Sequence, residues 1–203
     1  MNNSIYLFFK RVFDITFSII VLLLLLVPLI IISITIKISS KGPILYKWEV
    51  VGENEIFFQS YKFRTMVNNA DELKNKLKNY NEMTGPFFKM KNDPRITWIG
   101  SYLRKYSLDE LPQFISVFQG KMSVVGPRPP LQSEYKNFSN FQKKKLTVKP
   151  GLTCLWQVDG RNNINDADEW IKKDLEYISK RSFILDLKII LKTIITVFKG
   201  TGK

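Results

Sequence analysis

Histidine is absent from the 203-residue chain, and cysteine occurs once, as Cys154. Without histidine there can be no histidine general base, histidine nucleophile or histidine-ligated zinc site. A single cysteine excludes an internal disulfide and a thiolate metal cluster. An enzyme built from these residues must therefore act through carboxylates, Lys and Arg side chains, hydroxyl groups or a hard metal ion held by oxygen atoms.

Acidic residues are scarce as well. The chain has 18 Asp and Glu against 31 Lys and Arg, a formal net charge of +13. Such an excess favours anionic partners, namely phosphates, acidic lipid or nucleic acid. No nucleic-acid-binding motif is present, so we expect no nucleic-acid partner. The length of 203 residues is enough for one compact domain with an anchor, and the hydrophobic fraction of 45% allows that domain a sizeable core.

Residues 15–36 contain no charged side chain. A run of this length can cross a bilayer, which takes about 20 residues. Pro28 interrupts it, and proline kinks or breaks a helix. Basic residues flank the run on both sides, so the positive-inside tendency prefers neither orientation; they are Lys10 and Arg11 before it and Lys37, Lys41 and Lys47 after it. A spanning helix and a re-entrant helix that bends at Pro28 are equally compatible with these residues.

The remaining residues predict an α+β fold, in which a compact and mostly helical domain carries a small β-hairpin. We place an N-terminal membrane segment at residues 1–40 and this domain at residues 41–203. The predicted strands are 44–50 and 55–63, around a turn at 52–54. The predicted helices are 69–80, 98–106, 108–118, 133–146 and 166–178, with an irregular loop at 126–130.

The C-terminal segment, residues 184–198, has a helical pattern of a different kind. Its apolar residues fall at 184, 187, 191, 194, 195 and 198, and three lysines lie outside that stripe. A basic amphipathic helix can lie in a membrane interface. Packing of the stripe into the protein core is an equally common use of such a pattern.

Residues 107–112 read Ser-Leu-Asp-Glu-Leu-Pro. Ser107 and Glu110 fit a helix capping box, which is the structural interpretation. Pro112 would then lie inside the helix, where it disturbs the turn. In the functional interpretation, one carboxylate of Asp109 and Glu110 is a covalent nucleophile and the other holds Mg²⁺.

Cations that suit phosphate chemistry are spread over several polar turn segments: Lys62, Arg64, Arg95, Arg104 and Arg128. Phosphoryl transfer mainly requires charge neutralisation and in-line placement. The structural alternatives are an exposed basic strand end for Lys62 and Arg64, and a rigid turn with a solvated side chain for Arg128.

Taken in order, these segments resemble the bacterial sugar transferase family, the monotopic phosphoglycosyl transferases. The matching segments are Lys-Arg-Val-Phe-Asp at 10–14, Tyr-Lys-Phe-Arg-Thr-Met at 61–66, Asn-Asp-Pro-Arg-Ile-Thr at 92–97, residues 103–113 around Asp109, Met-Ser-Val-Val-Gly-Pro-Arg-Pro at 122–129, Lys-Pro-Gly-Leu-Thr at 149–153, Leu-Trp-Gln-Val at 155–158, Gly-Arg-Asn at 160–162, Asp-Leu at 174–175 and Leu-Asp-Leu-Lys at 185–188. Several such segments in one order are specific to the family.

The resemblance implies a re-entrant membrane helix at the cytoplasmic face of the bacterial inner membrane. It also implies a two-step reaction, in which Asp109 attacks the sugar-bearing phosphate of a UDP-sugar and releases UMP. Undecaprenyl phosphate then takes the phospho-sugar, the first lipid-linked step of capsule, exopolysaccharide or O-antigen synthesis. Glu110 would hold Mg²⁺, with Mn²⁺ as an alternative. The residues implied in substrate or phosphate binding are Lys62, Arg64, Arg95, Arg104, Arg128, Gln157, Arg161 and Asn162.

Further partners implied are anionic membrane lipid and, as an open possibility, a second copy of the chain. The Leu-Trp-Gln-Val segment favours UDP-glucose or UDP-galactose as donor. The chain departs from the family at residues 48–50, where Trp-Glu-Val replaces Gln-x-Arg, at Lys121 and at Val27. The alternative function is a basic, membrane-tethered binding or scaffold protein without catalysis, for which Asp109 would be dispensable.

Overall fold

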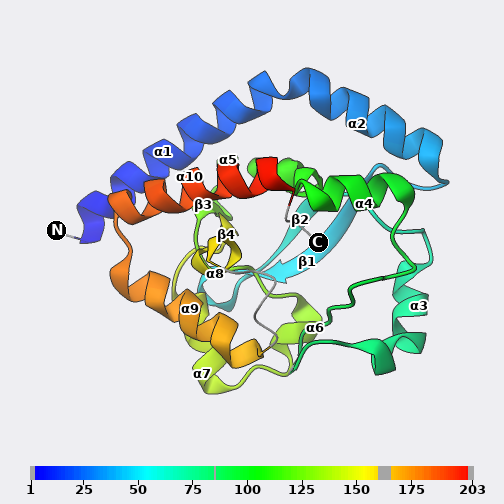
Figure 1. Ribbon diagram of the computed structural model, residues 1–203. Helices are drawn as coiled ribbons and strands as arrows, with labels where there is room; N and C mark the ends of the chain where they lie inside the picture. Colours follow the sequence, from blue (N-terminus) through cyan, green and yellow to red (C-terminus); the bar gives the residue numbers. More distant parts are fainter. Residues whose placement is uncertain (1–2, 85, 160–165, 201–203) are drawn as a thin grey trace.

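The computed structural model describes residues 3–84, 86–159 and 166–200 of the chain. Two long helices, α1 (Asn3–Leu24) and α2 (Leu26–Ser39), form an arch above the rest of the molecule (Figure 1). Beneath the arch, helices α10 (Phe183–Lys199), α5 (Phe114–Phe118) and α4 (Trp98–Lys105) follow one another in a row. The α+β class predicted from the sequence is confirmed.

The arch is bent by 63° between α1 and α2. The break lies at Leu25, so the prediction of a break at Pro28 itself was wrong by three residues. The reason is that a proline ring disturbs the carbonyl four residues earlier and supplies no N–H to it. For Pro28 that carbonyl belongs to Leu24, the last residue of α1. A bend of this size makes an open arch rather than a tight hairpin.

The predicted β-hairpin is confirmed. Strands β1 (Leu45–Val51) and β2 (Phe57–Phe63) pair in antiparallel register from Leu45 opposite Phe63 to Val51 opposite Phe57. The turn is the 3₁₀ segment η1 (Glu53–Glu55), in which Asn54 and Glu55 have φ of 55° and 63°. Asparagine tolerates this left-handed region better than most residues, which suits the turn.

A second, parallel pair of short strands was not predicted: β3 (Ser123–Val125) and β4 (Gly151–Thr153). Each has only three residues, too few for a periodic signal. The core forms around this pair, where Val125, Val117 and Met122 pack with Tyr177 and Ile189. The smaller elements are α3 (Ala70–Lys76), η2 (Lys78–Tyr80), η3 (Leu108–Gln113), α6 (Gln132–Tyr135), α7 (Asn140–Lys143), η4 (Lys144–Thr147), α8 (Leu155–Val158) and α9 (Ala167–Lys180).

Residues 133–146 do not form the single helix that was predicted. The first helical segment, α6, ends at Tyr135, and a new one, α7, begins after Ser139. The Ser139 hydroxyl accepts from the backbone N–H of Gln142 at 3.3 Å, and the Gln142 side chain accepts from the backbone N–H of Ser139 at 3.0 Å. This reciprocal capping box starts a helix at a point where the sequence pattern suggested a continuous one.

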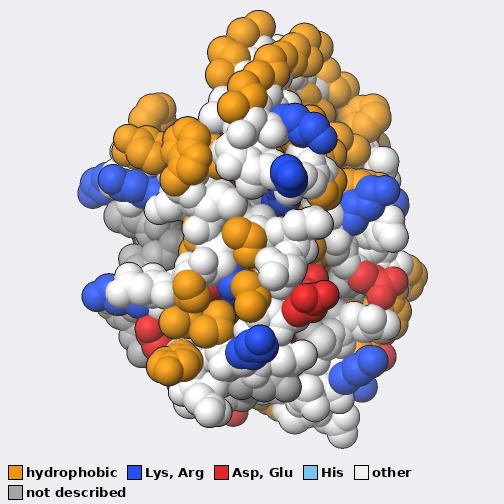
Figure 2. All heavy atoms as spheres, turned by 90° about the vertical axis from the view of Figure 1, so that its right-hand side faces the viewer, with side chains coloured by type: hydrophobic (Ala, Val, Ile, Leu, Met, Phe, Trp, Pro, Cys, Tyr) orange, Lys and Arg blue, Asp and Glu red, His pale blue; other side chains and the backbone are white. Residues whose placement is uncertain are grey.

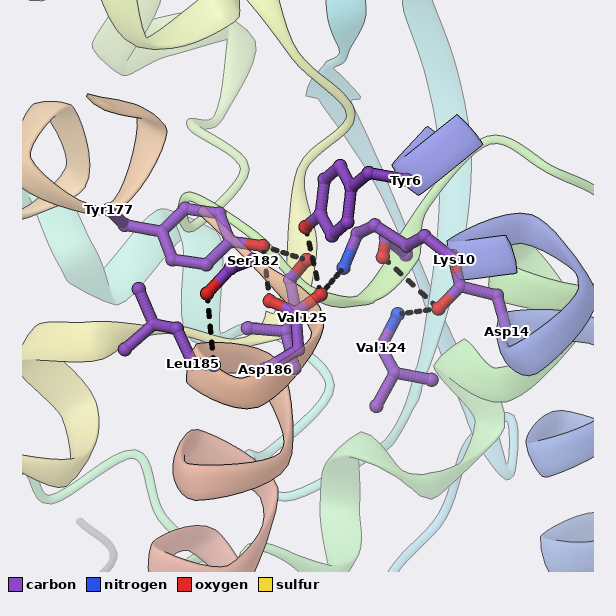
Figure 3. Close-up of polar contacts among 10 residues, drawn as sticks. Tyr6, Lys10, Asp14, Val124, Val125, Tyr177, Ser182, Leu185 and Asp186 are labelled. Carbon is purple, nitrogen blue, oxygen red and sulfur yellow. Dashed lines mark hydrogen bonds and ion pairs between the residues drawn. The ribbon is translucent and has the colours of Figure 1, made fainter. Parts of the chain in front are cut away.

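Two buried carboxylates attach α1 to the domain below it (Figure 3). Asp14 accepts from the Ser123 hydroxyl at 3.1 Å and from the backbone N–H of Val124 at 2.9 Å. Asp186, in the first turn of α10, accepts from the Tyr6 hydroxyl at 2.9 Å and from the Lys10 ammonium at 2.7 Å.

The Tyr177 hydroxyl, on α9, donates to the other Asp186 oxygen at 2.7 Å. Burial and the neighbouring Asp186 charge raise the pKa of Tyr177, so its hydroxyl stays protonated and remains a donor. Asp186 therefore holds α1, α9 and α10 together.

We expect Asp186→Asn to loosen this junction. The substitution keeps the side-chain size but removes the charge that balances Lys10, and charged hydrogen bonds of this kind contribute about 1.5–3 kcal/mol each. The expected result is a loss of that order in unfolding free energy, read by thermal unfolding of the protein in nanodiscs. Glu176→Gln is the control, because its ion pairs with Lys173 and Lys180 involve side chains at least one-third exposed and contribute about 1 kcal/mol or less. Equal losses in both variants would contradict the junction's role.

The outer side of the arch and of α10 is apolar. Large side chains are exposed along α1 and α2, among them Leu23, Leu24 and Val27. Figure 2 shows hydrophobic side chains gathered at the top of the molecule, with Lys and Arg side chains at a level below them. Within the described residues no single helix meets the length and hydropathy of a membrane span, although α1 and α2 do so as a bent pair.

The stripe predicted on the C-terminal helix lies outside the core. All six of its residues are exposed, from Leu187 at 39% to Phe198 at 82%. The face of α10 that packs against the core carries Asp186, Ile189 and Ile190 instead. Contiguous exposed apolar surface of this extent usually marks an interaction site, so the core-packing interpretation of the stripe was wrong.

Candidate active site

A polar cavity of about 390 Å³ opens between the β-hairpin, η3 and the loop at 126–130. It is the place where most of the residues singled out in the sequence meet. Those that line it are Lys62, Arg64, Arg104, Asp109, Glu110, Arg128 and Gln157. They come from five separate segments of the chain, namely the end of β2, α4, η3, the loop at 126–130 and α8, and the fold brings all five to the same cavity.

The carboxylate pair is presented by an irregular turn. Ser107 lies in the left-handed region, with φ of 53° and ψ of 23°, and its side chain makes no capping hydrogen bond to the described residues. The capping-box interpretation of Ser107 and Glu110 was therefore wrong. A non-glycine residue in this region carries strain that is often found at functional sites. The 3₁₀ segment η3 follows directly, and it places Asp109, 9% exposed, and Glu110 at the cavity.

Lys62 lies directly beside the pair. Its ammonium contacts the Glu110 carboxylate at 2.6 Å and lies 4.2 Å from the centre of the Trp48 ring. Both partners of the ion pair are about one-fifth exposed, so solvent and ligands still reach them. Lys62 is the penultimate residue of β2, and its pairing with Tyr46 in the hairpin fixes where the side chain begins.

Arg128 faces the cavity from the stiff Gly-Pro-Arg-Pro-Pro loop. Its guanidinium makes a two-pronged contact with Glu134, at 3.0 and 3.2 Å. Burial lowers the pKa of Arg128, but Glu134 and Glu110 outweigh burial and the pKa is raised. The planar fork is therefore fixed in orientation and always charged, which suits recognition of phosphate.

Below this loop lies a fully buried ion pair that the sequence did not predict. The Lys145 ammonium is 2.5 Å from the Asp174 carboxylate, and the side chains are 2% and 0% exposed. Burial raises the pKa of Asp174, although Lys145 and Arg128 both stabilise its ionised form. Asp174 therefore couples α9 and η4 to the loop that carries Arg128.

Arg64 and Arg104 line the cavity and also make hydrogen bonds to the segments that surround it. The Arg64 guanidinium donates to the backbone oxygens of Lys41 and Ser40, at 2.6 and 2.7 Å, just beyond the end of α2. Cations at a helix C-terminus satisfy its last carbonyls. Arg104 donates to the Thr65 hydroxyl at 2.9 Å. A substrate contact by either residue stays a prediction.

Among the described residues, Arg95 is the one predicted phosphate-binding cation that does not line the cavity. It forms two bonds with Asp93, at 2.6 and 2.9 Å, and one with the backbone oxygen of Ala70. Burial alone would raise the pKa of Asp93, but the bonds from Arg95 outweigh it and lower the pKa. Arg161 and Asn162, also predicted to bind substrate, lie outside the described residues.

Aromatic side chains form a second part of the wall that was not assigned from the sequence. Trp48, Phe88, Trp156 and Trp170 all line the cavity. Trp156 and Trp170 are stacked, with ring centres 4.3 Å apart and planes within 8°. They come from segments too far apart in the chain for any local pattern to join them. Such surfaces suit a planar base or the apolar face of a sugar.

Mg²⁺ fits the donor set of this cavity. Among the described residues, no group of three or more Asp, Glu, His or Cys side chains comes close enough to form a metal cage. Mg²⁺ is commonly held by one or two carboxylates together with waters and substrate phosphates. Glu110 and its neighbour Asp109 supply hard oxygen ligands of that kind, and the Lys62–Glu110 ion pair would have to rearrange or share an oxygen.

Comparison with known proteins gives one family and several relatives. The family model described as bacterial sugar transferase matches residues 5–200. The galactosyl transferase CpsE of Streptococcus agalactiae serotype III (strain NEM316) is 47% identical over 197 residues, which cover 97% of this chain and 44% of CpsE. The exopolysaccharide production protein ExoY of Rhizobium meliloti (strain 1021) is 38% identical over 197 residues, covering 95% of this chain and 87% of ExoY.

The name of a third relative includes a lipid carrier. The undecaprenyl-phosphate galactose phosphotransferase of Salmonella typhimurium (strain LT2) is 41% identical over 200 residues, which cover 96% of this chain and 41% of that protein. The chain thus spans less than half of CpsE and of the Salmonella protein, but most of ExoY.

Proposed function

Since the chain belongs to the bacterial sugar transferase family, we propose that it moves a sugar-1-phosphate from a UDP-sugar to undecaprenyl phosphate. One observation carries the proposal. The Asp109–Glu110 pair lies in a single cavity with Lys62, Arg104 and Arg128. Carboxylates and cations in this arrangement provide a nucleophile and the charge neutralisation that phosphoryl transfer requires.

In the first step, a carboxylate oxygen of Asp109 attacks the phosphorus that bears the sugar. A bond forms between that oxygen and phosphorus, and the bond from phosphorus to the bridging oxygen breaks. UMP leaves with the bridging oxygen and its electron pair, and Asp109 carries the phospho-sugar. Lys62 and Arg128 offset the negative charge that shifts onto the leaving group.

In the second step, an oxygen of undecaprenyl phosphate attacks the same phosphorus. The bond to Asp109 breaks, the free carboxylate is regenerated, and the product is a sugar linked to the lipid through a diphosphate. The acceptor phosphate is already ionised at neutral pH, so no general base is required. This is consistent with a chain that has no histidine.

Glu110 would hold Mg²⁺, which neutralises diphosphate charge when it is bound. We therefore expect excess EDTA to abolish UMP release and added Mg²⁺ to restore it, with Mn²⁺ as a second ion to test. Glu110→Gln should require a higher Mg²⁺ concentration for half-maximal activity than the wild type. Glu176→Gln, the same change at a carboxylate of α9 that does not line the cavity, serves as the control. Full activity in EDTA would remove the metal from the proposal.

The exposed apolar surface supports a location in the membrane. The α1–α2 pair has the length and composition of a bent membrane segment, and both ends of the arch come down beside the same row of helices (Figure 1). A re-entrant segment with this shape would place the cavity at the cytoplasmic face, where UDP-sugars are found. The exposed stripe of α10 would lie in the interface beside it.

The relatives suggest the sugar. CpsE is named for galactosyl transfer and the Salmonella protein for galactose phosphate transfer. Another relative, from Klebsiella pneumoniae, is named for glucose-1-phosphate transfer from UDP-glucose to undecaprenyl phosphate. UDP-galactose and UDP-glucose are therefore the first donors to test for this chain, in a role in exopolysaccharide or capsule synthesis.

The decisive experiment measures UMP release by nanodisc-held protein with Mg²⁺, undecaprenyl phosphate and a panel of UDP-sugars. The expected result is UMP release with one donor, accompanied by a radiolabelled lipid that carries both sugar and phosphate. Lipid that gains sugar without its phosphate, with UDP rather than UMP released, would overturn the proposed reaction. Absence of release with every donor would favour the non-catalytic binding or scaffold alternative.

A further inference from the structure

A second cavity, of about 260 Å³, lies between the arch and the domain. Phe17 and Val21 of α1 form one wall, and Ile190, Ile194 and Val197 of α10 form another. At its outer end are Ile194 and Phe198, which are 45% and 82% exposed and belong to the apolar surface of α10. The cavity therefore begins at the surface that we place in the membrane interface.

At its inner end the cavity reaches the polar one. The two share three lining residues, namely Glu110, Leu152 and Gln157. Glu110 is also the residue that contacts Lys62 at 2.6 Å. An extended molecule in the second cavity would consequently have one end on the apolar surface and the other at the reactive carboxylates.

The polarity of the lining changes along the same direction, from apolar at the outer end of the second cavity to charged at its inner end. Among the described residues that form the second cavity, Glu110 alone is charged, and most of the others are aliphatic or aromatic. A charged group placed along its length would lose hydration without gaining a partner, which is costly. A molecule with a long apolar chain and one anionic end fits this distribution, with the anion at the shared end beside Lys62.

We infer that the second cavity binds the isoprenoid chain of the acceptor next to its phosphate, while the nucleotide-sugar occupies the polar cavity. The inference rests on the proposed function and adds where the second substrate binds. The chain enters between α1 and α10 from the apolar surface, and its phosphate meets the Asp109 adduct at the junction of the two cavities. After UMP has left, the acceptor phosphate attacks in line with the bond to Asp109, from the position that the bridging oxygen of UMP occupied.

The test uses substitutions that narrow the second cavity and leave the residues of the polar cavity unchanged. Ile194→Trp places an indole in its outer half, and Ile195→Trp is the matched control, because Ile195 is an exposed isoleucine on the same helix that does not line the cavity. Two quantities are measured with the protein in nanodiscs. One is the burst of UMP without acceptor, which reports only the first step. The other is the KM for undecaprenyl phosphate.

The expected result is an unchanged burst in both variants and a KM for undecaprenyl phosphate raised about tenfold or more in Ile194→Trp alone. The burst also shows that the variant is folded. Val21→Phe, on the opposite wall, should act in the same way. In the wild type, farnesyl phosphate should be a better acceptor than dimethylallyl phosphate, and this preference should shrink in Ile194→Trp.

Equal KM values in the two tryptophan variants, with an active wild type, would overturn the acceptor site while leaving the proposed function intact. A burst lost in Ile194→Trp and in Val21→Phe, but kept in Ile195→Trp, would also overturn it, because the cavity would then serve the first step. A wild type that gives no UMP with any donor would instead remove the proposed function itself. These three results are distinct from one another.

Discussion

Asp109→Asn is expected to reduce UMP release by about 10³-fold or more, because loss of a covalent nucleophile commonly costs at least this much. An amide oxygen of asparagine has nearly the same size as the carboxylate oxygen but does not form a stable bond to phosphorus. Intact-mass measurement after mixing with donor alone should show a phospho-sugar adduct on the wild type. The variant should show none.

Asp168→Asn is the control for this experiment. Asp168 lies on α9, exposed and outside both cavities, and accepts a hydrogen bond from Gln142 that asparagine can still accept. UMP release that survives in Asp109→Asn would remove the covalent aspartate from the mechanism. Activity lost equally in both variants would point to folding rather than chemistry. The binding or scaffold alternative predicts that neither substitution matters.

The sequence predicted elements whose signal is local. The hairpin follows from alternating strands around the turn at Gly52, and α4, α9 and α10 were predicted within one or two residues. Several residues that line the polar cavity were predicted for a similar reason. Asp109 and Glu110 are adjacent in the chain, and the resemblance to a family placed Lys62 and Arg128 with them.

What the sequence did not predict depends on contacts between distant residues. Ser107 is of a residue type that commonly caps helices, but in the turn between α4 and η3 its backbone lies in the left-handed region. Arg64 was predicted to bind phosphate, and that contact stays a prediction. No pattern in the sequence indicated that its guanidinium also donates to carbonyls just beyond the end of α2, where the hairpin brings it. The division of the chain at residues 40 and 41, the Mg²⁺ ion and a homodimer stay predictions.

The Lys145–Asp174 pair should show the largest effect on stability. Removing one partner of a fully buried ion pair leaves an uncompensated charge, at a cost of about 3–5 kcal/mol. We therefore expect Asp174→Leu and Lys145→Met each to lower the unfolding free energy by that amount, read by thermal unfolding in nanodiscs. The double variant should recover most of the loss, because neither charge is then left without its partner.

The exposed pair of Lys192 and Asp159, at 2.6 Å, provides the matched control. Its separation is similar, but the side chains are 55% and 31% exposed, so Asp159→Leu should cost about 1 kcal/mol or less. A double variant at Lys145 and Asp174 that is no more stable than the singles would show that the two residues do not act as a pair.

The activity of the same double variant shows whether Asp174, besides stabilising the fold, also positions the loop that carries Arg128. Asp174 interacts with Arg128 as well as with Lys145, and the Arg128 loop closes one side of the polar cavity. Restored stability therefore should not restore the reaction in full. We expect a raised KM for the UDP-sugar, because the backbone of Arg128 loses its contact with Asp174 and the loop that carries the proposed diphosphate-binding guanidinium is held less firmly. The Mg²⁺ requirement should stay close to that of the wild type. Complete recovery of both stability and KM would instead show that the loop keeps its position without Asp174, held by its prolines and by Glu134 alone.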